Sequence, residues 1–176
     1  MDYVYYFGYG ANRDLDMIKA ITGSDPVWGK EAILKGYKLY LQPLKNIIDP
    51  KDFGQNDSFG ARTRLQGKWG EDFKSYVVKK DPSSSVAGTI WKFSVSDLRW
   101  VNNWELVDFG WYKVTLDFAE TKDGEKYLCY VQYLTENDKP GEEVDGLNYE
   151  TYINDKQEML DVATGLRDRI KKELCG

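Results

Sequence analysis

Acid–base chemistry in this chain must rest on Asp, Glu, Lys, Tyr or Cys side chains, because the sequence contains no histidine. Ser–His and Cys–His nucleophile pairs are therefore excluded, as are the commonest metal sites. The two cysteines, Cys129 and Cys175, are far apart in the sequence and form neither a disulfide framework nor a zinc knuckle. We expect no metal site.

Glu105 is the first candidate for acid–base work. A helix is predicted to begin at the capping-box-like pair Ser94 and Asp97, and Leu98, Val101 and Glu105 follow one face of it. A carboxyl on such an apolar stripe points toward the interior, and burial raises its pKa toward the value that a general base needs. The alternative is that Glu105 lies at the fraying end of the helix and reaches solvent.

The loop Gly8-Tyr9-Gly10-Ala11-Asn12 is the second candidate, because it joins a predicted strand to a helix. Backbone N–H groups of such a loop can bind a carboxylate or a phosphate. The third glycine of a dinucleotide-binding fingerprint would fall on Arg13, and no acidic residue follows a second parallel strand, so a Rossmann site is rejected. A simple strand-ending turn is the alternative.

Aromatic residues make up 15% of the chain, which indicates either a dense core or an aromatic-lined pocket. Tyr112, Tyr130 and Tyr133 lie on a predicted hairpin, where alternation puts Tyr130 on the face opposite to Tyr133. Strand tyrosines usually pack with a solvated hydroxyl. A row of exposed tryptophans would instead indicate a surface that binds carbohydrate or peptide; the candidates are Trp28, Trp69, Trp100 and Trp111.

These residues must be positioned by the predicted secondary structure, which consists of several strands and a few helices. Helices are predicted after Asp14, from Asp97 to about Glu105, and over about 149–174, and a turn is predicted at 81–84. Strands are predicted at 2–9, 32–42 (with a possible bulge at Gly36), 76–79, 86–93, 112–119 and 126–135.

This order predicts one α+β domain over residues 1–176, built on a curled, barrel-like mixed β-sheet with a few flanking helices. The periodicity fades over residues 43–72, and this stretch is long for a loop, so we expect an insertion or a lid there.

Charge and hydropathy limit the kinds of binding partner and the location that we expect for this chain. The net charge of -5 argues against broad binding to nucleic acid, which needs clustered Lys and Arg. No apolar run approaches the roughly 20 residues of a membrane span, and the N-terminus lacks a signal-peptide layout. We expect a soluble cytoplasmic monomer or homodimer.

Several motifs together resemble the γ-glutamylcyclotransferase family, which includes the AIG2-like proteins. The stretch Tyr6-Phe7-Gly8-Tyr9-Gly10-Ala11-Asn12 is similar to the family's opening Tyr-Gly-Ser-Asn loop. Residues 86–91 followed by 96–98 resemble its glycine-containing strand and the helix after it, and Glu105 falls where the family's catalytic glutamate ends that helix. The resemblance covers most of the chain in order and is poorest over 43–72.

The resemblance extends to three further aromatic residues. Tyr112 matches the residue that opens the next strand, Tyr133 a pocket tyrosine near the end of the following strand, and Tyr152 a further pocket tyrosine. Two positions depart from the family pattern. Ala11 replaces the usual serine but keeps the backbone donors, and Leu106 stands where a glycine commonly follows the glutamate, so a different local turn is expected.

The resemblance implies an enzyme that cleaves a small-molecule γ-glutamyl amino acid or amine without a cofactor. The substrate's own α-amine attacks its γ-carbonyl and releases 5-oxoproline and a free amine, so no Ser, Cys or His nucleophile is needed. The resemblance implies that Glu105 is the general acid/base and that residues of the first loop bind the substrate, together with Tyr112, Tyr133 and Tyr152: Gly8, Tyr9, Gly10, Ala11 and Asn12. The alternative is a non-catalytic protein that binds a small metabolite on the same scaffold.

Overall fold

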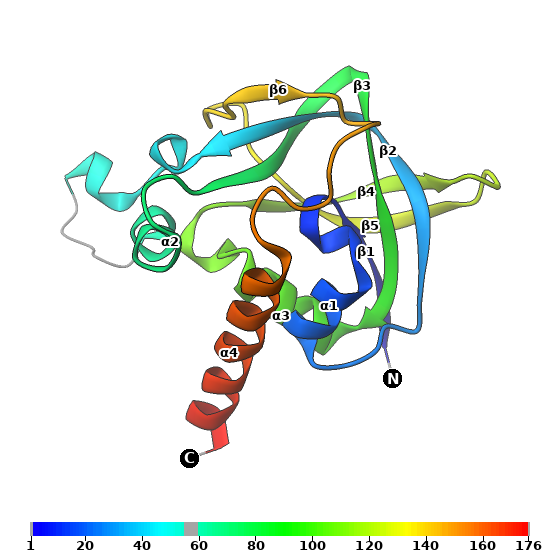
Figure 1. Cartoon of the computed structure of the whole chain (residues 1–176). Helices are drawn as coiled ribbons and strands as arrows, with labels where there is room; N and C mark the ends of the chain where they lie inside the picture. The colour runs from blue at the N-terminus through cyan, green and yellow to red at the C-terminus, as the bar shows by residue number, and fades with distance from the viewer. Residues whose placement is uncertain (1, 55–59, 176) are drawn as a thin grey trace.

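Five strands of a mixed sheet close into a barrel in the computed structural model, which describes residues 2–54 and 60–175 (Figure 1). Around the barrel the order is β3-β1-β5-β4-β2, and β2 pairs with β3 to close it. The short strand β6 is an additional strand that also pairs with β2. Only the β1–β5 pairing is parallel among the described pairs of named strands. The predicted α+β barrel is confirmed. The strands are β1 Tyr3–Gly8, β2 Trp28–Pro43, β3 Lys74–Ser94, β4 Lys113–Thr121, β5 Lys126–Tyr133 and β6 Glu142–Val144.

The barrel curls where the two longest strands, β2 and β3, pair irregularly. Between the pairs Lys35↔Ser85 and Tyr37↔Lys80 the register shifts, with Gly36 at φ 83° on β2 and residues 81–84 on β3. The predicted bulge at Gly36 is confirmed, whereas the predicted turn at 81–84 is wrong, because β3 is one continuous strand. The Ser83 N–H still donates to the Asp81 carboxylate, but it does so within that strand. A bulge of this kind bends and twists the strands that carry it.

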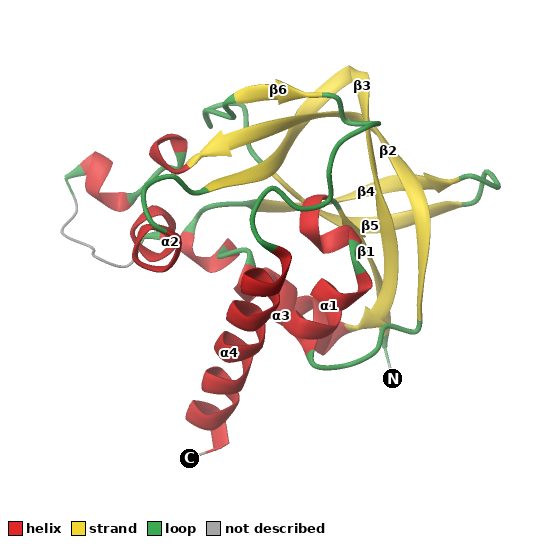
Figure 2. Cartoon of the chain, viewed as in Figure 1, coloured by secondary structure: helices red, strands yellow, loops and turns green. Residues whose placement is uncertain are grey.

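The helices gather on one side of the barrel, with α1, α3 and α4 close together (Figure 2). Asp14 caps α1 and the Ser94–Asp97 capping box begins α3, both as predicted. The helix α4 begins at Lys156 rather than near residue 149, because the chain ahead of it is an irregular segment against the barrel. The described α-helices are α1 Leu15–Thr22, α2 Ala61–Trp69, α3 Val95–Trp104 and α4 Lys156–Cys175, and none is long and apolar enough to cross a membrane.

The segment 43–72 is more regular in its described part than the sequence indicates. It contains the short 3-10 helices Leu44–Asn46 and Pro50–Phe53 and then α2, which the sequence analysis missed; residues 55–59 of the segment lie outside the described residues. Only Ala61 and Leu65 of α2 are buried, so the helix has almost no apolar stripe to detect. The prediction of an insertion or lid stays untested.

Three apolar clusters hold the fold together. One fills the barrel, a second lies between β1, β3 and the helices α1, α3 and α4, and a third packs α2 against the start of β4. Val101 of α3 belongs to the second cluster, and Leu106 packs at the edge of the third. The C-terminal end of α3, and Glu105 with it, is therefore held between these two clusters.

Candidate active site

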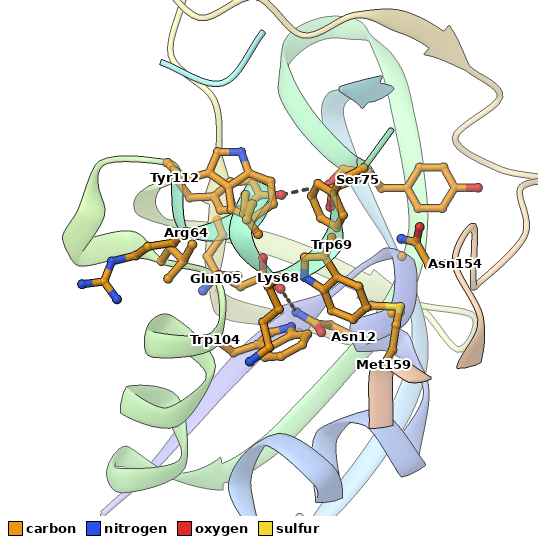
Figure 3. A pocket seen from close by; sticks show the side chains of 18 of the residues that line it. Asn12, Arg64, Lys68, Trp69, Ser75, Trp104, Glu105, Tyr112, Asn154 and Met159 are labelled. Atoms are coloured by element: carbon orange, nitrogen blue, oxygen red, sulfur yellow. Dashed lines mark hydrogen bonds between the residues drawn. The ribbon is translucent and has the colours of Figure 1, made fainter. Parts of the chain in front are cut away.

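A cavity of about 430 Å³ opens beside the barrel, between the first loop, the end of α3 and the helices α2 and α4 (Figure 3). Glu105 and Asn12 face one another at this cavity, and Tyr112, Trp69 and Trp104 surround them. The four helix and loop segments that line it are far apart in the sequence. The barrel and its packed helices bring them together.

Glu105 reaches the cavity because α3 ends at this residue. Its backbone N–H still donates to the Val101 carbonyl oxygen (3.0 Å), and the following residue, Leu106, turns the chain with φ 52° and ψ 37°. Leu106 is the one non-glycine residue with positive φ in the described ranges. This left-handed conformation favours glycine. Leu106 adopts it at the steric cost that a glycine would avoid.

The Glu105 carboxyl is half-buried and accepts a hydrogen bond from one donor among the described residues. Asn12 Nδ2 donates to Glu105 Oε1 over 2.6 Å. Desolvation raises the pKa of Glu105 to about 7, and the Asn12 hydrogen bond opposes this rise by favouring the charged form. Both protonation states are therefore accessible near neutral pH, as a group that accepts and returns a proton requires. The alternative of a solvated Glu105 at a fraying helix end does not hold.

A chain of buried hydrogen bonds fixes the Asn12 amide that holds Glu105. Asn12 Nδ2 also donates to Tyr6 Oη (2.9 Å), Tyr6 Oη donates to Gln132 Oε1 (3.2 Å), and Gln132 Nε2 donates to Asn102 Oδ1 (2.9 Å). The Asn12 carbonyl oxygen accepts from Trp91 Nε1 over 2.8 Å. Sequence analysis missed the positioning role of Tyr6 and Gln132. Their alternating strand positions carry no signal of it, since the two residues meet only in the folded barrel.

The first loop forms a 3-10 helix over Gly10–Arg13, and its backbone donors are partly used. The Gly10 N–H donates to Tyr149 Oη and the Asn12 N–H to the Tyr9 carbonyl oxygen, both over 3.2 Å. The N–H groups of Tyr9 and Ala11 have no partner among the described residues, and both residues line the cavity. These two amides are left as donors for an anionic or carbonyl oxygen of a ligand.

The structure brings six of the nine predicted site residues together around the cavity: Glu105, Tyr9, Gly10, Ala11, Asn12 and Tyr112. Tyr112 is buried and donates from its hydroxyl to the Tyr76 carbonyl oxygen (3.0 Å).

Gly8, Tyr133 and Tyr152 do not line the cavity. A side chain at Gly8 would meet the Asn12 carbonyl oxygen at 2.2 Å, so this glycine lets the loop fold back on β1. Tyr133 packs against the barrel core at the end of β5. Tyr152 lies near the start of α4, and its hydroxyl donates to Asp14 Oδ2 over 3.0 Å. Its hydroxyl therefore faces α1 rather than the cavity.

Sequence analysis also missed the outer wall of the cavity, which α2 and α4 supply. Lys68, Trp69, Met159 and Arg169 line it, and these residues carried no motif in the sequence. Trp69 therefore faces the cavity and Trp111 is buried, so no exposed row of tryptophans forms. No group of three or more Cys, Asp or Glu side chains in the described ranges could hold a metal ion.

The fold resembles solved structures at low sequence identity. One, named as a gamma-glutamyl cyclotransferase, is 17% identical with a TM-score of 0.60, and the match covers 93% of this chain and 99% of that one. An uncharacterised human protein is 17% identical with a TM-score of 0.58 and the same coverage. An Arabidopsis thaliana protein is 12% identical with a TM-score of 0.52, over 99% of this chain and 91% of that one. These likenesses show the fold. No protein-family model matches the sequence, and no curated protein matches it.

Proposed function

We propose that this protein is a γ-glutamylcyclotransferase, which releases 5-oxoproline and a free amine from a small γ-glutamyl substrate. The observation that carries the proposal is the Glu105 carboxyl, which faces the cavity, accepts the Asn12 hydrogen bond of 2.6 Å and has a pKa of about 7. A desolvated carboxyl beside a loop with spare N–H donors suits proton transfer to and from a substrate held by that loop.

The proposed reaction removes two protons from the attacking nitrogen and delivers one to the leaving nitrogen. The α-amine of the substrate has a pKa of about 8, so most of it is protonated at neutral pH and cannot attack a carbonyl. The Glu105 carboxylate takes this proton, and the free amine attacks the γ-carbonyl carbon. Glu105 returns this proton to the leaving nitrogen as the C–N bond breaks. Its carboxylate then takes the second proton that the attacking nitrogen must lose to become the N–H of the 5-oxoproline ring, and passes it to solvent. Since the pKa of Glu105 lies close to that of the amine, the first transfer is not strongly uphill.

The first loop supplies the proposed oxygen-binding groups. The N–H groups of Tyr9 and Ala11 bind the substrate's α-carboxylate or the oxygen of the γ-carbonyl, where negative charge develops during attack. Losing one such donor typically lowers the rate about 100- to 1000-fold. The same contacts hold the amine over the carbonyl carbon, which contributes the orientation that an intramolecular attack requires.

The test is release of 5-oxoproline from a panel of γ-glutamyl amino acids and γ-glutamyl amines. The wild type is compared with Glu105→Gln and with the matched control Glu173→Gln, which changes an exposed carboxyl at the end of α4. We expect Glu105→Gln to lower turnover by about 100- to 10,000-fold while circular dichroism stays unchanged. Retained turnover in Glu105→Gln would rule out the mechanism.

A non-catalytic binding protein on the same scaffold is the second candidate. Ala11 and Leu106, the two departures from the resembled family, favour it. Tight binding of γ-glutamyl compounds by the wild type, with no 5-oxoproline released from any of them, would support this function instead. In that case Glu105→Gln would alter affinity alone.

A further inference from the structure

The cavity extends well beyond Glu105 and the first loop. Its volume of about 430 Å³ lies in the range of pockets that enclose ligands of drug size. The far part is lined by α2 and α4, which contribute Lys68, Trp69, Met159 and Arg169. If the glutamyl group of the substrate binds at the first loop, the far part of the cavity holds the amine that is released.

Aromatic rings line the path from Glu105 to α2. Tyr112 lies close to Trp111 (ring centroids 4.5 Å apart), Trp111 meets Phe73 edge-on (6.2 Å), and Phe73 stacks on Trp69 (5.9 Å, planes 23° apart). All four line the cavity. Burial, and next the nearby charge of Glu105, raise the pKa of Tyr112, so the row begins beside the acid and ends at α2. Such a row suits a flat or apolar segment.

Positive charge collects at the α2–α4 end of this row. Lys68 and Arg169 come from different helices, and neither has a hydrogen bond or an ion pair within the part of the chain that the structure describes. By contrast Arg167, two residues before Arg169, pairs with Asp168 (2.9 Å). Glu105 is the one carboxylate among the described lining residues.

The charge of Arg169 also acts on Lys68. Desolvation, and then the charge of Arg169, lower the pKa of Lys68, so the Lys68 ammonium lies near the Arg169 guanidinium at the rim of the cavity. In a chain of net charge -5, two adjacent cations without a carboxylate partner repel each other unless an anion lies between them. A ligand with a carboxylate, phosphate or sulfate group would relieve this repulsion through charge-assisted hydrogen bonds.

We propose that the leaving amine of the substrate carries a flat aromatic segment followed by an anionic group. The ring lies along Trp69, Phe73 and Trp111, and the anion binds Lys68 and Arg169. The inference rests on the proposed function for the reaction itself and adds the class of amine that is released.

The test compares two probes that differ in one charge, γ-glutamyl-4-(aminomethyl)benzoate and γ-glutamyl-benzylamine. We expect kcat/KM of the wild type to be about 10-fold higher for the carboxylate probe. Lys68→Gln/Arg169→Gln removes this preference, because it lowers kcat/KM for the carboxylate probe more than for the benzylamine probe. The control Arg99→Gln/Lys172→Gln removes the same charge at exposed positions outside the cavity and keeps the preference.

Trp69→Leu tests whether an aromatic ring of the leaving amine lies along Trp69. We expect it to lower kcat/KM for both aromatic probes about 10-fold more than for γ-glutamyl-6-aminohexanoate, which has no ring. An equal loss for all three probes would overturn the assignment of the ring.

Equal kcat/KM for the carboxylate and benzylamine probes in the wild type overturns the inference, as does a preference that survives Lys68→Gln/Arg169→Gln. Absence of 5-oxoproline from every probe counts against the proposed function alone. Calorimetric affinities of the same two probes then decide the inference. Tighter binding of the carboxylate probe, lost in Lys68→Gln/Arg169→Gln, supports it, and equal affinities overturn it.

Discussion

Asn12 Nδ2 lies 2.6 Å from Glu105 Oε1 and joins the loop after the first strand to the C-terminal end of α3. The two residues are 93 positions apart, and the folded barrel alone brings them together. The contact does two things at once. It holds the carboxyl at the cavity, and it limits how far desolvation raises the pKa of Glu105, which stands at about 7.

The first prediction concerns the pH dependence of the rate. Glu105 must be ionised to accept the proton of the substrate amine, so kcat/KM rises with pH, and this rise has a midpoint of about 7. The measurement is the rate of 5-oxoproline release between pH 5 and about 7.5, below the pKa of the substrate amine. A midpoint near 4.5, the ordinary value for a glutamate, would mean that Glu105 is not the desolvated base.

The second prediction concerns stability. The folded chain holds a proton on Glu105 up to a pH of about 7, whereas the unfolded chain loses it near 4.5. The stability that this group contributes is therefore fully present below about 4.5 and is lost as the pH rises to about 7. Glu105→Gln avoids burying the charge, and we expect it to raise the free energy of unfolding at pH 8 by on the order of 1–3 kcal/mol. Because the carboxyl is only half-buried, solvent screens part of its charge, and we expect a gain at the lower end of this range.

Urea denaturation at pH 5 and pH 8 measures this effect. The gain from Glu105→Gln should be larger at pH 8 than at pH 5, and Glu173→Gln should show no such difference because its side chain is exposed. An equal gain at both pH values would contradict a raised pKa for Glu105.

Local sequence signals predicted the part of the site that depends on neighbouring residues. The Ser94–Asp97 capping box fixes where α3 begins, and the spacing of Leu98, Val101 and Glu105 places the carboxyl on the inner face. These features act within one helical turn or two, so they can be found in the sequence.

Features that depend on tertiary contacts could not be predicted in the same way. The sequence signal for a turn at 81–84 corresponds to a local contact, since the Asp81 carboxylate accepts from the Ser83 N–H (3.0 Å). The strand nevertheless continues, because β2 pairs with β3 on both sides of these residues. The helix α2 buries too few side chains to show a period. The Tyr6–Gln132 hydrogen bond joins residues 126 positions apart, and no local pattern marks it.

The third prediction concerns Asn12. Replacing it by alanine removes the donor that stabilises the charged carboxyl, so Asn12→Ala raises the pKa of Glu105 further and moves the midpoint of the pH–rate profile upward. We also expect kcat/KM at pH 7 to fall about 10- to 100-fold, because one charged hydrogen bond and the position of the carboxyl are lost.

The pH–rate profile of Asn12→Ala separates this effect from a general loss of structure. Asn148→Ala, at an exposed position away from the cavity, is the control and should keep the wild-type profile. A fall in rate with an unmoved midpoint would mean that Asn12 does not act through the charge of Glu105.

The fourth prediction concerns Gly8, which lies outside the cavity lining yet shapes it. A Cβ there would lie 2.2 Å from the Asn12 carbonyl oxygen and 3.0 Å from Trp91 Nε1, so Gly8→Ala must displace the loop that carries Asn12. We expect a loss of about 1–3 kcal/mol in the free energy of unfolding and a fall in kcat/KM, because the Asn12–Glu105 contact lengthens. Thermal unfolding and 5-oxoproline release measure the two effects.

Gly165→Ala is the matched control for Gly8→Ala. Gly165 lies inside α4, where an added Cβ meets nothing within 4 Å. The same substitution there should stabilise the chain by roughly 0.5–1 kcal/mol, because alanine favours the helix, and should leave the rate unchanged. If Gly8→Ala instead kept both the wild-type stability and the wild-type rate, the close approach of β1 to Asn12 would not be what positions the amide beside Glu105.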